Sequence, residues 1–306
     1  MSHACRWTRD TRVSRHPRVN SPPARQQKAR QIYHNTVSGA LLAGMEAKRK
    51  RLPATPTDAP RNGSDVAKGI AAMCEDCEPC ELRPRAFFVA WSGVMTLAWH
   101  GFPPVLAGLK RRIVETFPAL SPEKPGSKWP KTTLGCLKEG ARLTPDQLRK
   151  LTQLCDRFFM SLPAAERELS PLATTPKFEP VDSLSVVLFQ CRSLERVLSE
   201  HEVRLGGQTR NRDRPERDEE TVVDRVLVES SVENLERYWP LVARDGGREG
   251  HYRDVNFGAT LVARLKRLPA AVAQFRLAVD EALPGMYVWF DDSSLHVTLR
   301  GLVDPP

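Results

Sequence analysis

Leu295-His296-Val297-Thr298-Leu299-Arg300-Gly301-Leu302, near the end of the chain, alternates between apolar and polar residues. This alternation predicts a β-strand, because successive side chains of a strand point to opposite faces of a sheet. His296 and Thr298 are two positions apart, so we expect them to share one face while the apolar residues between them pack on the other. An imidazole beside a hydroxyl suits a site that holds a phosphate and moves a proton.

An earlier stretch, Pro130-Lys131-Thr132-Thr133-Leu134-Gly135-Cys136-Leu137, shares the order polar residue, any residue, Thr, Leu. Each stretch follows a tryptophan, a helix opened by proline and, before that, a strand. The first copy consists of Val94–Trp99, a helix from Pro103–Pro104, Trp129 and Pro130–Leu137. The second copy consists of Leu261–Leu265, a helix from Pro269, Trp289 and Leu295–Leu302. This repeated order indicates an internal duplication. We therefore predict an α+β fold of two similar α/β lobes with antiparallel sheets about a pseudo-twofold axis.

The remaining elements follow from local patterns. Thr144-Pro145-Asp146-Gln147 predicts a helix start, with Thr as N-cap, Pro in the first turn and Gln closing a capping box. Apolar runs predict further strands, and helical spacing predicts further helices. The strands are expected at Ala86–Trp91, Leu184–Gln190, Arg225–Ser230 and Tyr287–Phe290, and the helices at Leu194–Val203 and Val232–Val242.

Charge divides the chain into two parts. The net charge is +9, but residues 1–60 hold 12 Lys and Arg and 3 Asp and Glu, which leaves 34 of each sign in residues 61–306. We predict a disordered basic extension over residues 1–83 and a neutral bilobal domain over residues 84–306, with an exposed charged loop at 206–220. The Arg-rich start is typical of a transit peptide, and Lys48–Arg51 is typical of a nuclear-import or RNA-contacting cluster, so the compartment stays open.

The junction between these parts carries Cys74, Cys77 and Cys80. Three thiols at this spacing fit a small metal site or a redox cluster, but zinc would need a fourth ligand and the neighbouring acids discourage thiolates. A cysteine-rich junction without metal is the alternative. The seven cysteines of the chain do not form a secreted disulfide pattern, and no apolar run reaches the length of a membrane span. We expect no membrane partner and no metal cofactor.

Over residues 86–302 the chain resembles the two-histidine (2H) phosphoesterases, which include RNA ligase/cyclic phosphodiesterase enzymes. The resemblance rests on Trp289–Leu302 and on Pro130–Leu148. It implies two lobes that each present a His-x-Thr motif to one groove, where one histidine acts as general base and the other as general acid on a 2′,3′-cyclic phosphate or a 2′–5′ linkage of RNA or a nucleotide, without metal. It also implies that His296 is catalytic and that Thr298 and Thr133 bind phosphate. We expect a monomer.

Lys131 departs from that pattern, because it stands where the resemblance implies the first histidine. A lysine titrates near 10.4, so bringing it to about 7 requires a shift of more than roughly 3 pH units. With such a shift Lys131 is a catalytic acid or base; without it Lys131 only binds phosphate. In that second case the chain is an inactive RNA- or nucleotide-binding relative. A third interpretation is that the chain is a scaffold protein.

Five other side chains complete the prediction. Arg300 alternates onto the face of His296 and Thr298 and is expected to bind phosphate. His100 and His251 are alternative proton carriers, while a solvated loop residue is the other interpretation of His251. The tryptophans before the two motifs either stack on a base or lie in the core.

Overall fold

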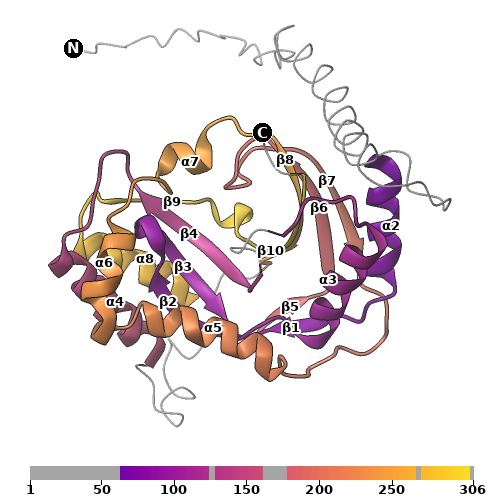
Figure 1. Ribbon diagram of the computed structural model, residues 1–306, viewed down its shortest axis with the longest axis horizontal. Coiled ribbons are helices and arrows are strands. Elements are labelled where there is room, and N and C mark those ends of the chain that lie inside the picture. The colour runs from indigo at the N-terminus through magenta and orange to yellow at the C-terminus, as the bar shows by residue number, and fades with distance from the viewer. Residues whose placement is uncertain (1–62, 124–127, 161–177, 267–269, 304–306) are drawn as a thin grey trace, which may run out of the picture. The chain divides into compact units, whose positions relative to one another are not determined.

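The protein is described by a computed structural model that covers residues 63–123, 128–160, 178–266 and 270–303. It is an α+β structure whose strands form two antiparallel four-stranded sheets and one antiparallel pair (Figure 1). The predicted α+β class with antiparallel sheets is therefore confirmed.

The first sheet has the order β2-β3-β4-β9. Its strands are β2 (Pro84–Val89), β3 (Met95–Trp99), β4 (Lys131–Leu137) and β9 (Tyr287–Trp289). The hairpin between β2 and β3 turns at Ser92 and Gly93, which both have positive φ angles (59° and 77°). In β4, Gly135 makes room for its neighbour, because a Cβ there would lie 2.5 Å from the carbonyl oxygen of Val288. Strand β4 lies between β3 and β9 in this sheet, so it is an interior strand that is paired on both sides.

The second sheet has the order β10-β8-β6-β7. Its strands are β10 (His296–Val303), β8 (Gly258–Arg264), β6 (Ser183–Phe189) and β7 (Val197–Arg204). Strand β10 pairs only with β8, so it is an edge strand, and it lies in contact with β4 of the first sheet. The antiparallel pair joins β1 (Cys80–Leu82) to β5 (Glu179–Val181).

Two pairs of helices pack against a sheet other than the one that contains their named neighbours in sequence. Helices α2 (Gly63–Glu75) and α3 (Pro104–Thr116) flank β2 and β3 in sequence but contact strands of the second sheet. Helices α4 (Pro145–Met160) and α8 (Ala270–Ala282) flank β6 and β8 in sequence but lie beside the first sheet (Figure 1). Phe275 of α8 stacks on Phe87 of β2, with 4.2 Å between ring centroids.

The start of α4 has the predicted capping box. The Gln147 amide donates to the Thr144 hydroxyl (3.2 Å), and the Thr144 amide donates to the Gln147 side chain (2.9 Å). Between β7 and β8 the chain forms α5 (Arg217–Glu229), α6 (Leu235–Val242) and the short helix α7 (Glu249–Arg253). These helices separate β7 from β8 in sequence, although both strands belong to the second sheet.

Three local predictions are wrong. Residues 63–82 belong to the folded part, because Val66, Ile70 and Cys74 recur at helical spacing and are buried. Leu194–Val203 contains β7 rather than a helix, since pairing with β6 outweighs its helical spacing. Arg225–Ser230 lies in α5, which also takes in the last residues of the predicted 206–220 loop.

The cause of the α5 error is visible in its packing. Val223, Val226 and Leu227 are three and four positions apart and lie against Phe88 and Trp129. A run of apolar residues that looks like a strand is therefore the buried face of a helix. Residues 1–62 of the predicted basic extension, including the Lys48–Arg51 cluster, lie outside the described residues.

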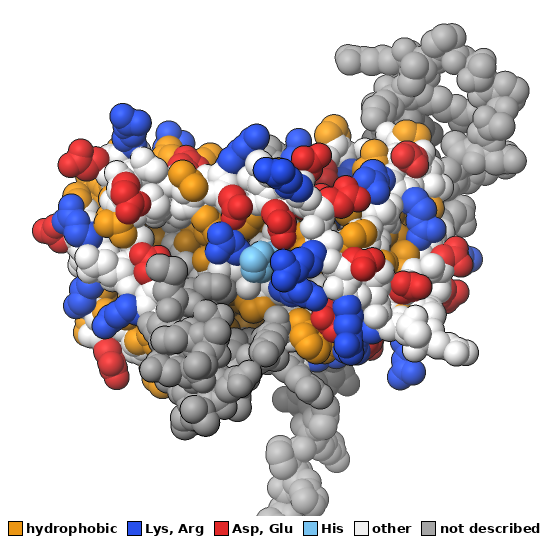
Figure 2. Space-filling view, turned by 90° about the horizontal axis from the view of Figure 1, so that it is seen from below, with side chains coloured by type: hydrophobic (Ala, Val, Ile, Leu, Met, Phe, Trp, Pro, Cys, Tyr) orange, Lys and Arg blue, Asp and Glu red, His pale blue; other side chains and the backbone are white. Residues whose placement is uncertain are grey.

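Acidic and basic side chains are interspersed over the face shown in Figure 2. This mixture agrees with the equal numbers of both signs in residues 61–306. Within the described residues, every helix is too short or too polar to cross a bilayer.

Candidate functional site

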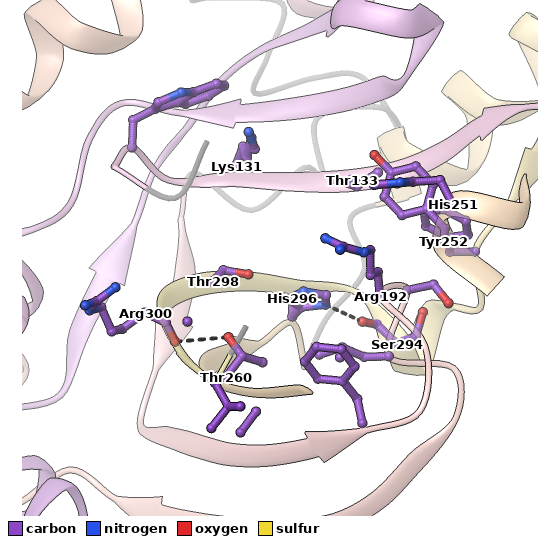
Figure 3. Close-up of a pocket in the computed structure, with 18 of the residues that line it drawn as sticks. Lys131, Thr133, Arg192, His251, Tyr252, Thr260, Ser294, His296, Thr298 and Arg300 are labelled. Atoms are coloured by element: carbon purple, nitrogen blue, oxygen red, sulfur yellow. Dashed lines mark hydrogen bonds between the residues drawn. The ribbon is translucent and has the colours of Figure 1, made fainter. Parts of the chain in front are cut away.

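A cavity of about 380 Å³ lies where β4 and β10 meet. Lys131 and Thr133 of β4 line it together with His296 and Thr298 of β10. Figure 3 shows these side chains around the space between the two strands. The structure therefore brings the predicted residues of both motifs, 165 positions apart in sequence, to one pocket of a size that suits a nucleotide.

On β4, alternation separates the pocket from the core. Lys131 and Thr133 are half-buried at the pocket, whereas Thr132 is fully buried and accepts a hydrogen bond from Trp99 Nε1 (3.1 Å). The Lys131 ammonium lies 4.9 Å from the centroid of the Trp129 ring, which also lines the pocket. A cation over an indole face is attracted by the ring. Trp129 thus helps to hold the ammonium in the cavity.

On β10, His296 and Thr298 are half-buried, whereas Val297 and Leu299, which each follow one of them, are fully buried. This confirms the predicted alternation. The Nδ1 atom of His296 lies 2.8 Å from the carbonyl oxygen of Ser294. A carbonyl oxygen can only accept, so Nδ1 carries the proton and the lone pair of the neutral ring is on Nε2. This tautomer leaves Nε2 as the proton acceptor.

Burial shifts the pKa values of both groups downward. It lowers the pKa of Lys131 from its ordinary value to about 8, and burial is the cause, without a contribution from Lys128. Burial likewise lowers the pKa of His296 to about 4, partly offset by the hydrogen bond to Ser294. At neutral pH, His296 is then a neutral base, and Lys131 is a protonated acid with a pKa within about one unit of the solution pH.

Arg300 lies at one end of the pocket but is turned away from the two motif residues of its strand. A β-bulge after Thr298 breaks the alternation, because Thr298 pairs with Val262 and Arg300 with Leu261. The buried Arg300 guanidinium donates to the carbonyl oxygen of Ser121. Its role as a phosphate ligand stays a prediction.

The other predicted site residues differ in whether they line the cavity. His251 lines the pocket from α7, with its ring 4.9 Å from that of Tyr252 and at 87° to it. His100 is not among the pocket residues and lies instead near Arg85 and Asp224. Trp289 is also outside the pocket, since its indole donates to Asp280 on α8 (2.8 Å). Of the two tryptophans, Trp129 alone lines the cavity.

Two titratable residues of the pocket were not predicted as site residues from the sequence. Arg192 lies in the loop after β6, and Tyr252 lies on α7 and forms a side-chain hydrogen bond with Thr133. Neither belongs to a motif. Arg192 reaches the pocket from the loop between β6 and β7, and Tyr252 reaches it from α7 in the long segment between β7 and β8. The only signal in sequence was the pair His251-Tyr252 beside a predicted strand.

The three cysteines at the predicted junction are buried in the core. Burial raises the pKa of the Cys74 and Cys80 thiols to about 12, so both are protonated at neutral pH. Cys77 donates to the Met73 carbonyl (3.2 Å), and Arg112 donates to its sulfur (3.0 Å). Among the described residues, no group of three or more His, Cys, Asp or Glu side chains is placed to hold a metal ion.

A scan against protein-family models and searches of curated proteins and of solved structures each find no match to this chain.

Proposed function

We propose that this protein is a 2H-phosphoesterase-like hydrolase that opens a 2′,3′-cyclic phosphate, or cleaves a 2′–5′ linkage, at an RNA end or on a nucleotide. The observation that carries the proposal is the meeting of the Lys131-x-Thr133 and His296-x-Thr298 strands at one cavity. Two proton-transfer groups beside two hydroxyls can serve an in-line displacement at a phosphate.

The order of elements supports the pseudo-twofold arrangement that belongs to this proposal. The series α2, β1, β2, β3, α3, β4 corresponds to α4, β5, β6, β8, α8, β10 once β7, β9 and the helices between β7 and β8 are set aside. The corresponding strands β1 and β5 pair with each other, antiparallel, as elements near a twofold axis would. The corresponding helices pack on opposite sheets.

The chemistry follows from the protonation states. A water molecule attacks phosphorus while His296 Nε2 takes its proton, and the Lys131 ammonium gives a proton to the leaving ribose oxygen as the P–O bond breaks. Thr133 and Thr298 donate hydrogen bonds to the non-bridging oxygens. The product is a phosphate monoester, and the two protonation states are restored by exchange with solvent.

The test is hydrolysis of a dinucleotide with a 2′,3′-cyclic phosphate by the wild type and by His296→Ala. We expect turnover by the wild type and a loss of about 10²- to 10⁴-fold in the variant, because a placed base contributes that much. His201→Ala is the matched control, since His201 is exposed on β7 and outside the pocket. It should keep full activity.

The alternative function is an inactive RNA- or nucleotide-binding protein of the same fold. What favours it is Lys131 itself, since a lysine holds a phosphate without needing to transfer a proton. Micromolar binding of the dinucleotide without turnover would overturn the hydrolase and support this alternative. Absence of both turnover and binding would favour a scaffold.

A further inference from the structure

The charge of the cavity exceeds what a single bound phosphate requires. Its titratable lining residues are Lys131, Arg192, His251, Tyr252, His296 and Arg300. No Asp or Glu of the described residues lines it. The nearest acid in sequence to Arg192 is Glu195, which instead binds Arg253 through two hydrogen bonds of 2.8 Å. Such a pocket favours a ligand with more than one negative charge.

Arg192 is held in place in this pocket. Its Nε lies 3.0 Å from the Asn256 side-chain oxygen, with the amide oriented so that this oxygen faces the guanidinium. The next residue, Ser193, donates its backbone N–H to the Tyr252 carbonyl oxygen (3.0 Å), which joins the loop to α7. Figure 3 shows the guanidinium between His296 and Tyr252, directed into the space below β4.

Arg192 enters the cavity on the side of Tyr252 (Figure 3). Burial alone lowers the pKa of Lys131, and the charges that affect the pKa of His296 are those of Arg264 and Glu200. The charge of Arg192 instead lowers the pKa of Tyr252, against the upward effect of burial. Arg300, at the other end, is bound to the Ser121 carbonyl oxygen. The guanidinium of Arg192 is therefore a second positively charged group in the pocket, on the side of Tyr252.

We infer that Arg192 binds a second phosphoryl group of the substrate, beyond the phosphate that reacts between Lys131 and His296. This inference rests on the proposed function for the place of the first phosphate. A guanidinium oriented by one side chain and half-buried in a cavity suits a phosphate oxygen pair. The second group is either a terminal 5′-phosphate or the diester of a neighbouring nucleotide. The contact with Arg192 makes the protein select nucleotides with two phosphates over nucleotides with one.

The experiment compares binding of three product-like ligands by calorimetry. These are adenosine 3′-monophosphate, adenosine 3′,5′-bisphosphate and a diadenosine nucleotide that carries a 3′-phosphate and a 5′-hydroxyl. We expect the wild type to bind one or both of the latter two about 10- to 100-fold more tightly than the monophosphate, as one charge-assisted contact provides. The bisphosphate identifies a terminal phosphate as the source, and the dinucleotide identifies a neighbouring diester.

Arg192→Gln should abolish this preference and leave the affinity for the monophosphate within about threefold. That second readout excludes a collapsed pocket, which would weaken both. Arg196→Gln, exposed in the same loop, is the matched control and should keep the preference. The inference is overturned if neither two-phosphate ligand gains affinity, or if the gain persists in Arg192→Gln. Because binding is measured, this outcome differs from a failure of the proposed function, which is absence of turnover.

Discussion

The strands β4 and β10 carry the same polar-x-Thr pattern in different settings. Strand β4 is paired on both sides, and its first residue, Lys131, lies against the Trp129 ring. Strand β10 is an edge strand with a bulge, and its first residue, His296, is fixed by the Ser294 carbonyl oxygen. Burial lowers the pKa of both residues. Lys131 nevertheless stays charged at pH 7 and His296 stays neutral, because their ordinary pKa values differ. A lysine at position 131 is therefore compatible with acid–base chemistry.

The largest expected effect comes from removing Lys131, the proposed proton donor. Lys131→Ala should lower kcat on a 2′,3′-cyclic phosphate by about 10²- to 10⁴-fold. Lys131→Arg keeps a positive charge that binds phosphate, but an arginine does not release its proton near neutral pH, so kcat should fall while product affinity stays within about threefold. Both are measured by steady-state kinetics and product binding.

Lys138→Ala provides the control for these variants. Lys138 follows the last residue of β4, is exposed and lies outside the cavity, so its loss should leave kcat unchanged. Wild-type kcat in Lys131→Arg would show that only the charge matters, and the asymmetry between β4 and β10 would have no role in proton transfer.

The next effect is on the pH dependence of kcat/KM. His296 must be neutral, which holds above its pKa of about 4, and Lys131 must be protonated, which holds below its pKa of about 8. The profile should be flat around neutral pH and fall about tenfold per unit above pH 8. This fall is measured most clearly between pH 7 and pH 9.5.

Replacement of Lys131 by histidine makes the two strands alike and should move that fall. A buried imidazolium loses its proton below its ordinary value of about 6.5, so the upper limb of Lys131→His should shift to a pH below 6.5. An upper limb that stays near pH 8 in this variant would assign it to another group.

Much of this comparison could be predicted from the sequence, and the reasons are local. The alternation in β10 and the capping box at Thr144 depend on neighbours two or three positions apart, so they could be predicted. Arg192 and Tyr252 could not, because they reach the site through loop and helix packing rather than through a pattern. The pKa of Lys131 depends on its burial, and the direction of Arg300 depends on a bulge; the sequence pattern reveals neither.

The smallest effect concerns the two threonines that the strands share. Thr298→Val should lower kcat/KM about 10- to 100-fold, as expected for one lost hydrogen bond to a charged oxygen. Thr133→Val should cost as much or more, because Thr133 also binds Tyr252. Tyr252→Phe separates the two roles, since it removes that bond and leaves the Thr133 hydroxyl for phosphate. Its kcat/KM should stay within about threefold of wild type.

Thr132→Val is the control on the same strand. Thr132 faces the core and accepts from Trp99 Nε1, so its loss leaves a buried donor unpaired and lowers the free energy of unfolding by about 1–3 kcal/mol without changing kcat/KM. Equal kinetic losses in Thr132→Val and Thr133→Val would mean that stability, and not phosphate contact, explains both. A loss confined to Thr133 and Thr298 assigns the shared threonine of β4 and β10 to the phosphate, whichever residue stands two positions before it.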